Sequence, residues 1–349
     1  MLNRIIGLSR LLSFIDDLGR DRRMVGPVRR DGRYFYDVVQ RASQLDLSFN
    51  YCEHSPKAVF MPARQTLFRY HRTSRGFETH TVLDRTPTLL AGVHPCDVNA
   101  LRLLDRVFSR THRDEQFLVR RENTFVIGVD CPKPCTDGVF CADMKGNEAQ
   151  DGFDLMLHPL ASGAGQETEF GCVFGSNRGR EKVVYGQVGR SPNVNDERRF
   201  EQYRAAKAAS FPRVIPETVD TLPDLLNRSY DSLLWEATAR RCYSCGSCNL
   251  SCPTCYCFNI QDEASLSGES GERAREWDGC QLRDFAEVAG GHNFRPKAAS
   301  RLRHRIYRKA KWIKEREGIA GCVGCARCDR ACTAKINSVE IYRQLAEEA

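Results

Sequence analysis

The sequence contains no apolar run that approaches the roughly 18 residues needed to span a membrane. It also lacks a His-Glu-x-x-His zinc motif, a three-glycine dinucleotide fingerprint and tandem Cys-Cys-Gly motifs. The paired C-x2-C segments typical of a nickel-iron active site are missing as well. These absences exclude the familiar routes to substrate activation, and we therefore assign no catalytic residues in this chain.

The composition, with 41% hydrophobic and 28% charged residues, is typical of a folded soluble protein and excludes wholesale disorder. A length of 349 residues suits two domains. Residues 1–21 carry Leu and Ile at helical spacing, interrupted by Arg10, Asp16 and Asp17, and they offer no small-residue cleavage site. We therefore expect an N-terminal helix that packs on its own domain, and a cytoplasmic protein.

Two apolar runs, at residues 87–93 and 124–129, end in Gly-Val and are typical of strands buried on both faces of a parallel sheet. A cysteine follows each run, Cys96 after the first and Cys131 after the second. Between the runs, Asp97 is expected to cap a helix with apolar residues at helical spacing. This order places both cysteines at the carboxyl ends of neighbouring strands, where open α/β sheets build ligand sites.

Farther along the chain, residues 169–173 and 182–188 alternate like hairpin strands, and residues 197–209 have helical spacing. Pro212, Pro216 and Pro223 then mark a linker. Residues 1–220 are therefore predicted to form an α/β domain with a parallel-type sheet, and residues 221–349 a second, α-helical domain. The predicted fold class is α+β multidomain.

Seventeen cysteines are present, and eleven of them lie between Cys242 and Cys332. The spacing C-x2-C-x2-C-x3-C of bacterial ferredoxins occurs twice in this segment. The first motif consists of Cys242, Cys245, Cys248 and Cys252, and the second of Cys322, Cys325, Cys328 and Cys332. At this spacing three thiolates bind one 4Fe-4S cluster and the fourth completes the other cluster. We therefore predict two clusters with crossed ligands, one held by Cys242, Cys245, Cys248 and Cys332 and the other by Cys322, Cys325, Cys328 and Cys252.

Structural zinc is the alternative, but zinc takes paired C-x2-C segments from distant parts of a chain and fits these compact runs poorly. The 69 residues between the motifs are predicted to be largely helical, including 282–289 and 297–314, which favours an α-helical dicluster ferredoxin-like domain. Cys255, Cys257 and Cys280 are expected to lie buried beside the ligands without binding iron. Eight thiolates on two cores of about +2 each would lower the formal charge of +7 to about +3.

The segments 242–263 (CYSCGSCNLSCPTCYCFNIQDE), 289–296 (AGGHNFRP) and 321–328 (GCVGCARC) resemble the beta subunit of sulfhydrogenase-type nickel-iron hydrogenases. The electron-transfer subunit of anaerobic sulfite reductase belongs to the same family. The likeness extends to residues 94–97, 120–122, 140–141 and 152–155, so it covers most of the chain. The resemblance implies a subunit that passes electrons between a diaphorase-type partner, which binds FAD and NAD(P), and a catalytic partner of the NiFe hydrogenase or sirohaem sulfite reductase type.

The chain departs from the family pattern at His94, where Arg is usual, at Val139, where Cys is usual, and at Ala326, where Gly is usual. Cys135, four residues after Cys131, is a candidate replacement for the cysteine missing at position 139. Two interpretations therefore stay open for the cysteines of the N-terminal half: a third 4Fe-4S cluster, or buried or merely reactive thiols at the ends of strands. This N-terminal cysteine group consists of Cys96, Cys131, Cys135 and Cys141.

Residues 295–316 contain ten Lys or Arg residues and a single acid, Glu315. Such a run can bind nucleic acid, but no aromatic platform or recognition motif accompanies it. We expect it to balance anionic clusters or to dock an acidic partner. The sequence thus favours a non-catalytic iron-sulfur electron-transfer subunit of a hydrogenase-type oxidoreductase complex. The alternatives are the electron-transfer subunit of an anaerobic sulfite reductase and, from another class, an iron-sulfur redox sensor that binds nucleic acid.

Overall fold

The computed structural model describes residues 2–161 and 167–348, and it contains two sheets. The larger sheet has seven strands in the order β1-β9-β8-β7-β6-β2-β3, and the smaller is antiparallel with the order β10-β11-β4-β5. The strands of the larger sheet are β1 (Arg4–Gly7), β2 (Arg23–Arg30), β3 (Arg33–Val39), β6 (Thr88–Val93), β7 (Thr124–Val129), β8 (Leu155–Leu160) and β9 (Glu169–Phe174). Those of the smaller sheet are β4 (Arg64–Thr73), β5 (Gly76–Thr81), β10 (Phe258–Ala264) and β11 (Ser270–Trp277).

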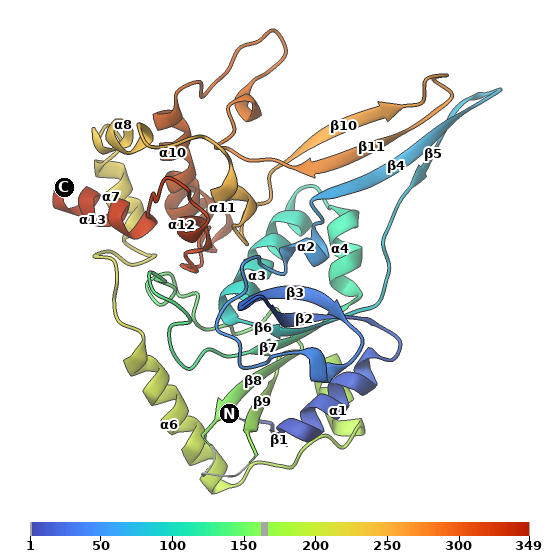
Figure 1. Cartoon of the computed structure of the whole chain (residues 1–349), viewed down its shortest axis with the longest axis vertical. Coiled ribbons are helices and arrows are strands. Elements are labelled where there is room, and N and C mark those ends of the chain that lie inside the picture. Colours follow the sequence, from blue (N-terminus) through green and yellow to red (C-terminus); the bar gives the residue numbers. More distant parts are fainter. Residues whose placement is uncertain (1, 162–166, 349) are drawn as a thin grey trace.

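Helices of the first half of the chain surround the larger sheet, with α1 on one face and α3 and α4 on the other (Figure 1). They are α1 (Leu8–Gly19), α2 (Lys57–Phe60), α3 (Pro95–Arg110), α4 (Glu115–Glu122), α5 (Asn177–Tyr185) and α6 (Val194–Ser210), with a 3-10 turn η1 (Ala42–Gln44). No helix among the described residues is both long and apolar enough to cross a membrane.

The remaining helices belong to the second half of the chain, around the cysteine motifs (Figure 1). They are α7 (Leu222–Arg228), α8 (Leu234–Ala239), α9 (Ser247–Leu250), α10 (Ala298–Tyr307), the π-helix η3 (Arg308–Trp312), α11 (Ile313–Glu317), α12 (Arg327–Arg330) and α13 (Ser338–Glu348), with a 3-10 turn η2 (Asp284–Ala286).

The centre of the larger sheet is built as its sequence predicts. Strands β6 and β7 are adjacent and parallel, and every residue in them is buried. Leu89 of β6 packs in the core on the α1 face, whereas Leu90 packs on the α3 face, because successive side chains of a strand point to opposite faces. Cys96 and Cys131 therefore follow neighbouring parallel strands at the same edge of the sheet.

Two local predictions in the first half are wrong. Helix α3 begins at Pro95 with His94 at its N-cap, so Asp97 lies in the first turn and its carboxylate binds Arg327 instead of capping the helix. Proline is well suited to the first helical position, because its missing N–H is not needed there. Residues 182–188, predicted to be a strand, lie largely in α5, whereas residues 169–173 form β9 as expected.

The second half is not all helical. Residues 297–314 are helical as predicted, but 282–289 contain only the short turn η2, and β10 and β11 form a long hairpin between the motifs. Strand β11 pairs with β4 of the first half, so the smaller sheet combines both halves and projects from the body of the molecule (Figure 1). A domain boundary near residue 220 stays a prediction, and any such division must leave this sheet shared.

The loop after β7 also joins the two halves. Phe140 and Met144 pack in the core of the second half, with Trp235 and Tyr342. The backbone N–H of Phe140 donates to the carbonyl of Gly324 at 2.9 Å, inside the second cysteine motif. The loop that carries the last cysteines of the N-terminal group is therefore held against the second motif.

Candidate functional site

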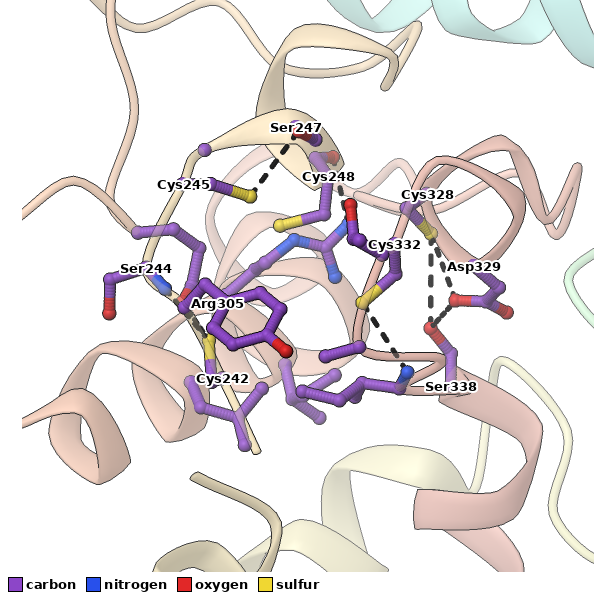
Figure 2. A pocket seen from close by; sticks show the side chains of 18 of the residues that line it. Cys242, Ser244, Cys245, Ser247, Cys248, Arg305, Cys328, Asp329, Cys332 and Ser338 are labelled. Atoms are coloured by element: carbon purple, nitrogen blue, oxygen red, sulfur yellow. Dashed lines mark hydrogen bonds between the residues drawn. The ribbon is translucent and has the colours of Figure 1, made fainter. Parts of the chain in front are cut away.

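The structure brings the cysteines of the two motifs to the walls of two adjoining cavities. The first cavity is lined by Cys242, Cys245, Cys248 and Cys332, with Arg305 beside them. Figure 2 shows these four sulfurs directed toward a common space, which the guanidinium of Arg305 also reaches. The first motif thus contributes three cysteines to this cavity, and the second motif contributes its last one, Cys332, as well as Cys328.

The second cavity has the complementary composition. Its cysteines are Cys252, Cys322, Cys325 and Cys328. Cys328 also borders the first cavity, so the two cavities share a wall. The cavity walls therefore place Cys332 with the first motif and Cys252 with the second, as crossed ligands would require, and Arg305 and Lys309 also line the second cavity.

The two motifs have the same backbone conformation, which aims amide groups at the sulfurs. In each motif the N–H two residues after the first cysteine, at Ser244 and Gly324, donates to that cysteine's sulfur at 3.4 Å. Each motif also has positive φ, between 52° and 77°, at two positions: Ser244 and Gly246 in the first, and Gly324 and Ala326 in the second. Glycine adopts this conformation readily, and alanine and serine less so, so Ala326 and Ser244 hold it at some cost.

The spacing of the sulfurs decides between zinc and a cluster. Among the described residues, no three cysteine sulfurs all lie within 4.8 Å of one another. A tetrahedral zinc ion with Zn–S bonds of about 2.3 Å would require sulfur separations of about 3.8 Å. The thiols are instead spread around each cavity, as they must be when iron and sulfide lie between them. The donor sets fit 4Fe-4S clusters.

Buried cations lie beside both cavities. Arg301, Arg305 and Lys309 follow one another at four-residue spacing along α10 and η3, and each is at most 6% exposed. Arg305 donates to the carbonyl of Cys248 and Lys309 to the hydroxyl of Thr254, so their hydrogen-bond acceptors are uncharged. The basic run was evident in the sequence, but this inward-facing stripe was not predicted, although its four-residue period within the run was a usable signal.

Cysteine sulfurs in their thiolate form supply the negative charge that these cations face. Burial alone would lower the pKa of Arg305, but the Cys248 and Cys328 thiols outweigh burial and raise it well above its usual range. Burial likewise opposes the charged form of Lys309, and the Cys252 thiol reverses the effect and raises its pKa. Both side chains therefore stay charged, and they stabilise negative charge inside the cavities.

The N-terminal cysteine group lies next to the second cavity. Burial, and then the neighbouring Cys135, raise the pKa of Cys131 well above its usual range, and the same two causes raise the pKa of Cys141 to about 12. Burial also raises the pKa of Cys96, which lies close enough to Cys131 and Cys325 to feel their charge. The structure thus brings all four thiols together, and in this environment they stay protonated unless a metal centre displaces the protons.

A buried polar network fixes the loop that carries this group. Asp130, at the end of β7, accepts hydrogen bonds from Tyr203 at 2.9 Å and Lys207 at 2.5 Å, and its carboxylate contacts His158 at 3.0 Å. Lys207 also donates to the carbonyl of Asn147 at 2.8 Å, at the far end of the loop. Helix α6 therefore holds both ends of the loop in place.

A buried ion pair connects this group to the second motif. The Arg327 guanidinium donates to both carboxylate oxygens of Asp97, at 2.6 and 2.7 Å, and its Nε donates to the carbonyl of Cys52. Arg327 stands between two cysteines of the second motif, and Asp97 directly follows Cys96. The ion pair therefore holds the N-terminal group and the second cavity in register. Nothing in the sequence pattern predicts this contact.

His94 is structural in this arrangement. It occupies the N-cap position of α3 without a capping hydrogen bond from its side chain, and its ring stacks on Phe49 with the centroids 4.1 Å apart. Burial, followed by the charge of Arg327, lowers its pKa to about 3, so the ring is neutral.

A methyl group at Gly324 is expected to disturb the contact between the two halves. A Cβ there would lie 2.4 Å from the carbonyl oxygen of Phe140 and 2.6 Å from the Cα of Cys141, whereas at Gly246 it would meet only the flexible side chain of Leu282, at 3.0 Å. Because φ is positive at both glycines, the left-handed conformation affects both alanine variants equally. Gly324→Ala should therefore lower the free energy of unfolding by about 1 to 3 kcal/mol more than Gly246→Ala. Anaerobic denaturant titration of the two variants measures this difference, and equal losses would contradict it.

Comparison with known proteins agrees with this geometry. Residues 241–336, which span both motifs, match the family described as a 4Fe-4S dicluster domain. The chain is also similar to sulfhydrogenase 2 subunit beta of Pyrococcus furiosus, with 31% identity over 335 residues, covering 96% of this chain and 95% of that protein. The similarity therefore extends through the N-terminal half as well as the dicluster domain. This chain is an iron-sulfur electron-transfer protein and belongs to the family of the sulfhydrogenase beta subunit.

Proposed function

We propose that this chain relays electrons between a diaphorase-type partner, which binds FAD and NAD(P), and a catalytic partner of the nickel-iron hydrogenase type. The observation that carries the proposal is the continuity of the three cysteine groups. The two cavities share a wall at Cys328, and the N-terminal group lies beside the second cavity at Cys325. Iron-sulfur clusters held at these positions would supply one-electron carriers in series.

Each group supplies four thiols, which is the number that a 4Fe-4S cluster takes. We assign the first cluster to Cys242, Cys245, Cys248 and Cys332, the second to Cys322, Cys325, Cys328 and Cys252, and the third to Cys96, Cys131, Cys135 and Cys141. Support for the third comes from the two rigid elements that carry it, the end of β7 and the first turn of α3. A reducing compartment such as the cytoplasm suits this many free thiols.

The burial of three of the ten basic residues in 295–316 favours a relay over a nucleic-acid sensor. Arg301, Arg305 and Lys309 are buried and therefore unavailable to an external partner. Buried cations beside a cluster favour its reduced, more negative state, which helps each centre to accept an electron. The same residues thus have a role in a relay and none in contacts with nucleic acid.

The relay is tested by breaking it at the N-terminal group within the whole complex. Cys135→Ala should remove about four irons per chain and interrupt electron transfer from NAD(P)H to the catalytic partner, because the third cluster needs four thiolates. Cys172→Ala is the matched control, since Cys172 is a fully buried cysteine in the core of the larger sheet, outside all three groups. Unchanged iron content and transfer in Cys135→Ala would reject the third cluster, and hydrogen or sulfite turnover by the isolated chain would reject the relay.

A further inference from the structure

Five of the seventeen cysteines lie outside the three groups described above, and three of these five lie close together. Cys255, Cys257 and Cys280 are not part of the walls of either cavity, and they lie together at the base of the hairpin formed by β10 and β11. We propose that this hairpin thiol group binds an additional iron-sulfur cluster through three thiolates. The inference goes beyond the proposed relay and does not depend on the N-terminal cluster.

The hairpin itself brings these cysteines together. Its two strands leave the body side by side, with Phe258 paired to Trp277. One residue beyond this pair, the N–H of Asp278 donates to the carbonyl of Cys257 at 3.1 Å, so the pairing continues into the body. The hairpin therefore brings Cys280 close to the segment that carries Cys255 and Cys257, although more than twenty residues separate Cys280 from that segment in sequence.

A buried amide is aimed at two of the three sulfurs. The side chain of Asn249 is 3% exposed, and its Nδ2 lies 3.6 Å from the sulfur of Cys255 and 3.5 Å from that of Cys280. Its Oδ1 accepts a hydrogen bond from the backbone N–H of Gln281, which fixes the direction of the amide. A Cβ at Gly279 would lie 2.6 Å from the Cβ of Asn249, so the backbone packs tightly around it.

This arrangement suits thiolates better than thiols. A neutral thiol is a weak hydrogen-bond acceptor, and a buried amide donor with only weak acceptors is poorly satisfied. Metal-bound thiolates are strong acceptors, and hydrogen bonds to cluster sulfurs are a regular means of tuning such centres. Asn249 therefore has the position and donor groups expected of a residue that stabilises a cluster.

A buried cation supplies the matching charge. Lys57, from α2 in the first half of the chain, is 4% exposed, and its ammonium donates to the carbonyls of Cys252 and Cys255 at 3.2 and 3.1 Å. The ammonium also lies 3.9 Å from the centre of the Trp277 ring. These partners are all uncharged, and a buried ammonium is costly without a nearby anion. Thiolates at Cys255 and Cys257 would provide such an anion, together with Cys252, the assigned ligand of the second cluster.

The spacing favours a cluster over a single ion. The sulfurs of Cys255, Cys257 and Cys280 do not all lie within 4.8 Å of one another, whereas a tetrahedral zinc or iron ion would hold them about 3.8 Å apart. A 4Fe-4S cluster held by three thiolates leaves one iron to a ligand other than cysteine. Asp278, opposite Cys257, carries a carboxylate at this end of the hairpin.

Iron analysis of the anaerobically purified full-length chain tests the inference. Cys257→Ala and Cys280→Ala should each contain about four irons fewer per chain than the parent, whereas Cys172→Ala should match the parent. The signals that Cys245→Ala and Cys325→Ala abolish should both persist in these variants. Parental iron content in Cys257→Ala and Cys280→Ala would overturn the inference, and so would the loss of one zinc ion in place of the irons.

A second variant keeps the test independent of folding. Asn249→Asp retains the oxygen that accepts from Gln281 but replaces the shared N–H donor with a negative charge. It should lower the reduction potential of this cluster more than those of the other two clusters of the dicluster domain, because the carboxylate would lie directly beside these thiolates and disfavour the reduced state. An unchanged potential would argue against a cluster between these sulfurs. Because Cys135→Ala tests the relay through a different centre, failure of either proposal leaves the other intact.

Discussion

Asp97→Asn is expected to lower the free energy of unfolding by about 3 to 5 kcal/mol, because it leaves the Arg327 guanidinium buried without a carboxylate. The two side chains are 1% and 3% exposed, and two hydrogen bonds join them. Asparagine keeps the shape and one acceptor oxygen but removes the charge. Since Arg327 stands within the second motif, the second cluster should also become labile. Denaturant titration and iron analysis of the variant measure both effects.

The control is to remove both charges. The double variant Asp97→Leu with Arg327→Met should recover most of the lost stability, because apolar side chains can replace a buried ion pair at little cost. A double-mutant cycle with the two single variants then isolates the coupling between the residues. A loss below about 1 kcal/mol in Asp97→Asn would show that the pair does not hold the two halves together.

The centre of the larger sheet could be predicted because its signals are local. Residues 88–93 and 124–129 are continuous apolar runs, and only strands covered on both faces bury such runs completely. The position of Cys96 and Cys131 followed directly, since each cysteine comes soon after one of these strands. The grouping of the eight motif cysteines was equally accessible, because the ferredoxin spacing determines it.

The hairpin of β10 and β11 could not be predicted in the same way. Every residue of β10 is exposed, and apolar and polar residues alternate only over its first four positions, Phe258 to Gln261, so the pattern marks it weakly as a strand. Its neighbour β11 pairs with β4, about 200 residues earlier in the chain, and a partner so distant leaves no local signal. Arg64 of β4 contacts Glu263, Glu272 and Glu276 of the hairpin, so charged pairs contribute to a pairing that hydrophobic periodicity does not reveal.

The burial of charged residues was the other feature that the sequence did not predict. The basic run 295–316 was expected to balance anionic clusters or to dock an acidic partner, but the burial of Arg301, Arg305 and Lys309 was not predicted. The ion pair of Asp97 and Arg327 is likewise visible only once both halves are folded. In each case the group that faces the buried charge lies far away in sequence, and the spacing of residues along the chain cannot identify that group.

Cys332→Ala is expected to remove the cluster of the first cavity and to leave the cluster of its own motif in place. Cys332 lines the first cavity with three cysteines of the first motif, and the N–H of Ile336 donates to its sulfur at 3.3 Å. Because a 4Fe-4S cluster takes four thiolates, the variant should lose about four irons per chain. Alanine is preferred to serine in this test, since a serine oxygen could still bind iron.

Two reference variants assign the lost signal. Cys245→Ala removes a ligand that lies only at the first cavity, and Cys325→Ala removes one that lies only at the second. With crossed ligands, the electron paramagnetic resonance spectrum of reduced Cys332→Ala should match that of Cys245→Ala, and the spectrum of Cys252→Ala should match that of Cys325→Ala. The opposite matches would mean that each motif completes its own cluster, in contrast to the grouping of cysteines at the cavity walls. Because Cys328 and Arg305 border both cavities, a small shift of the remaining signal is expected in each variant, whereas its loss is not.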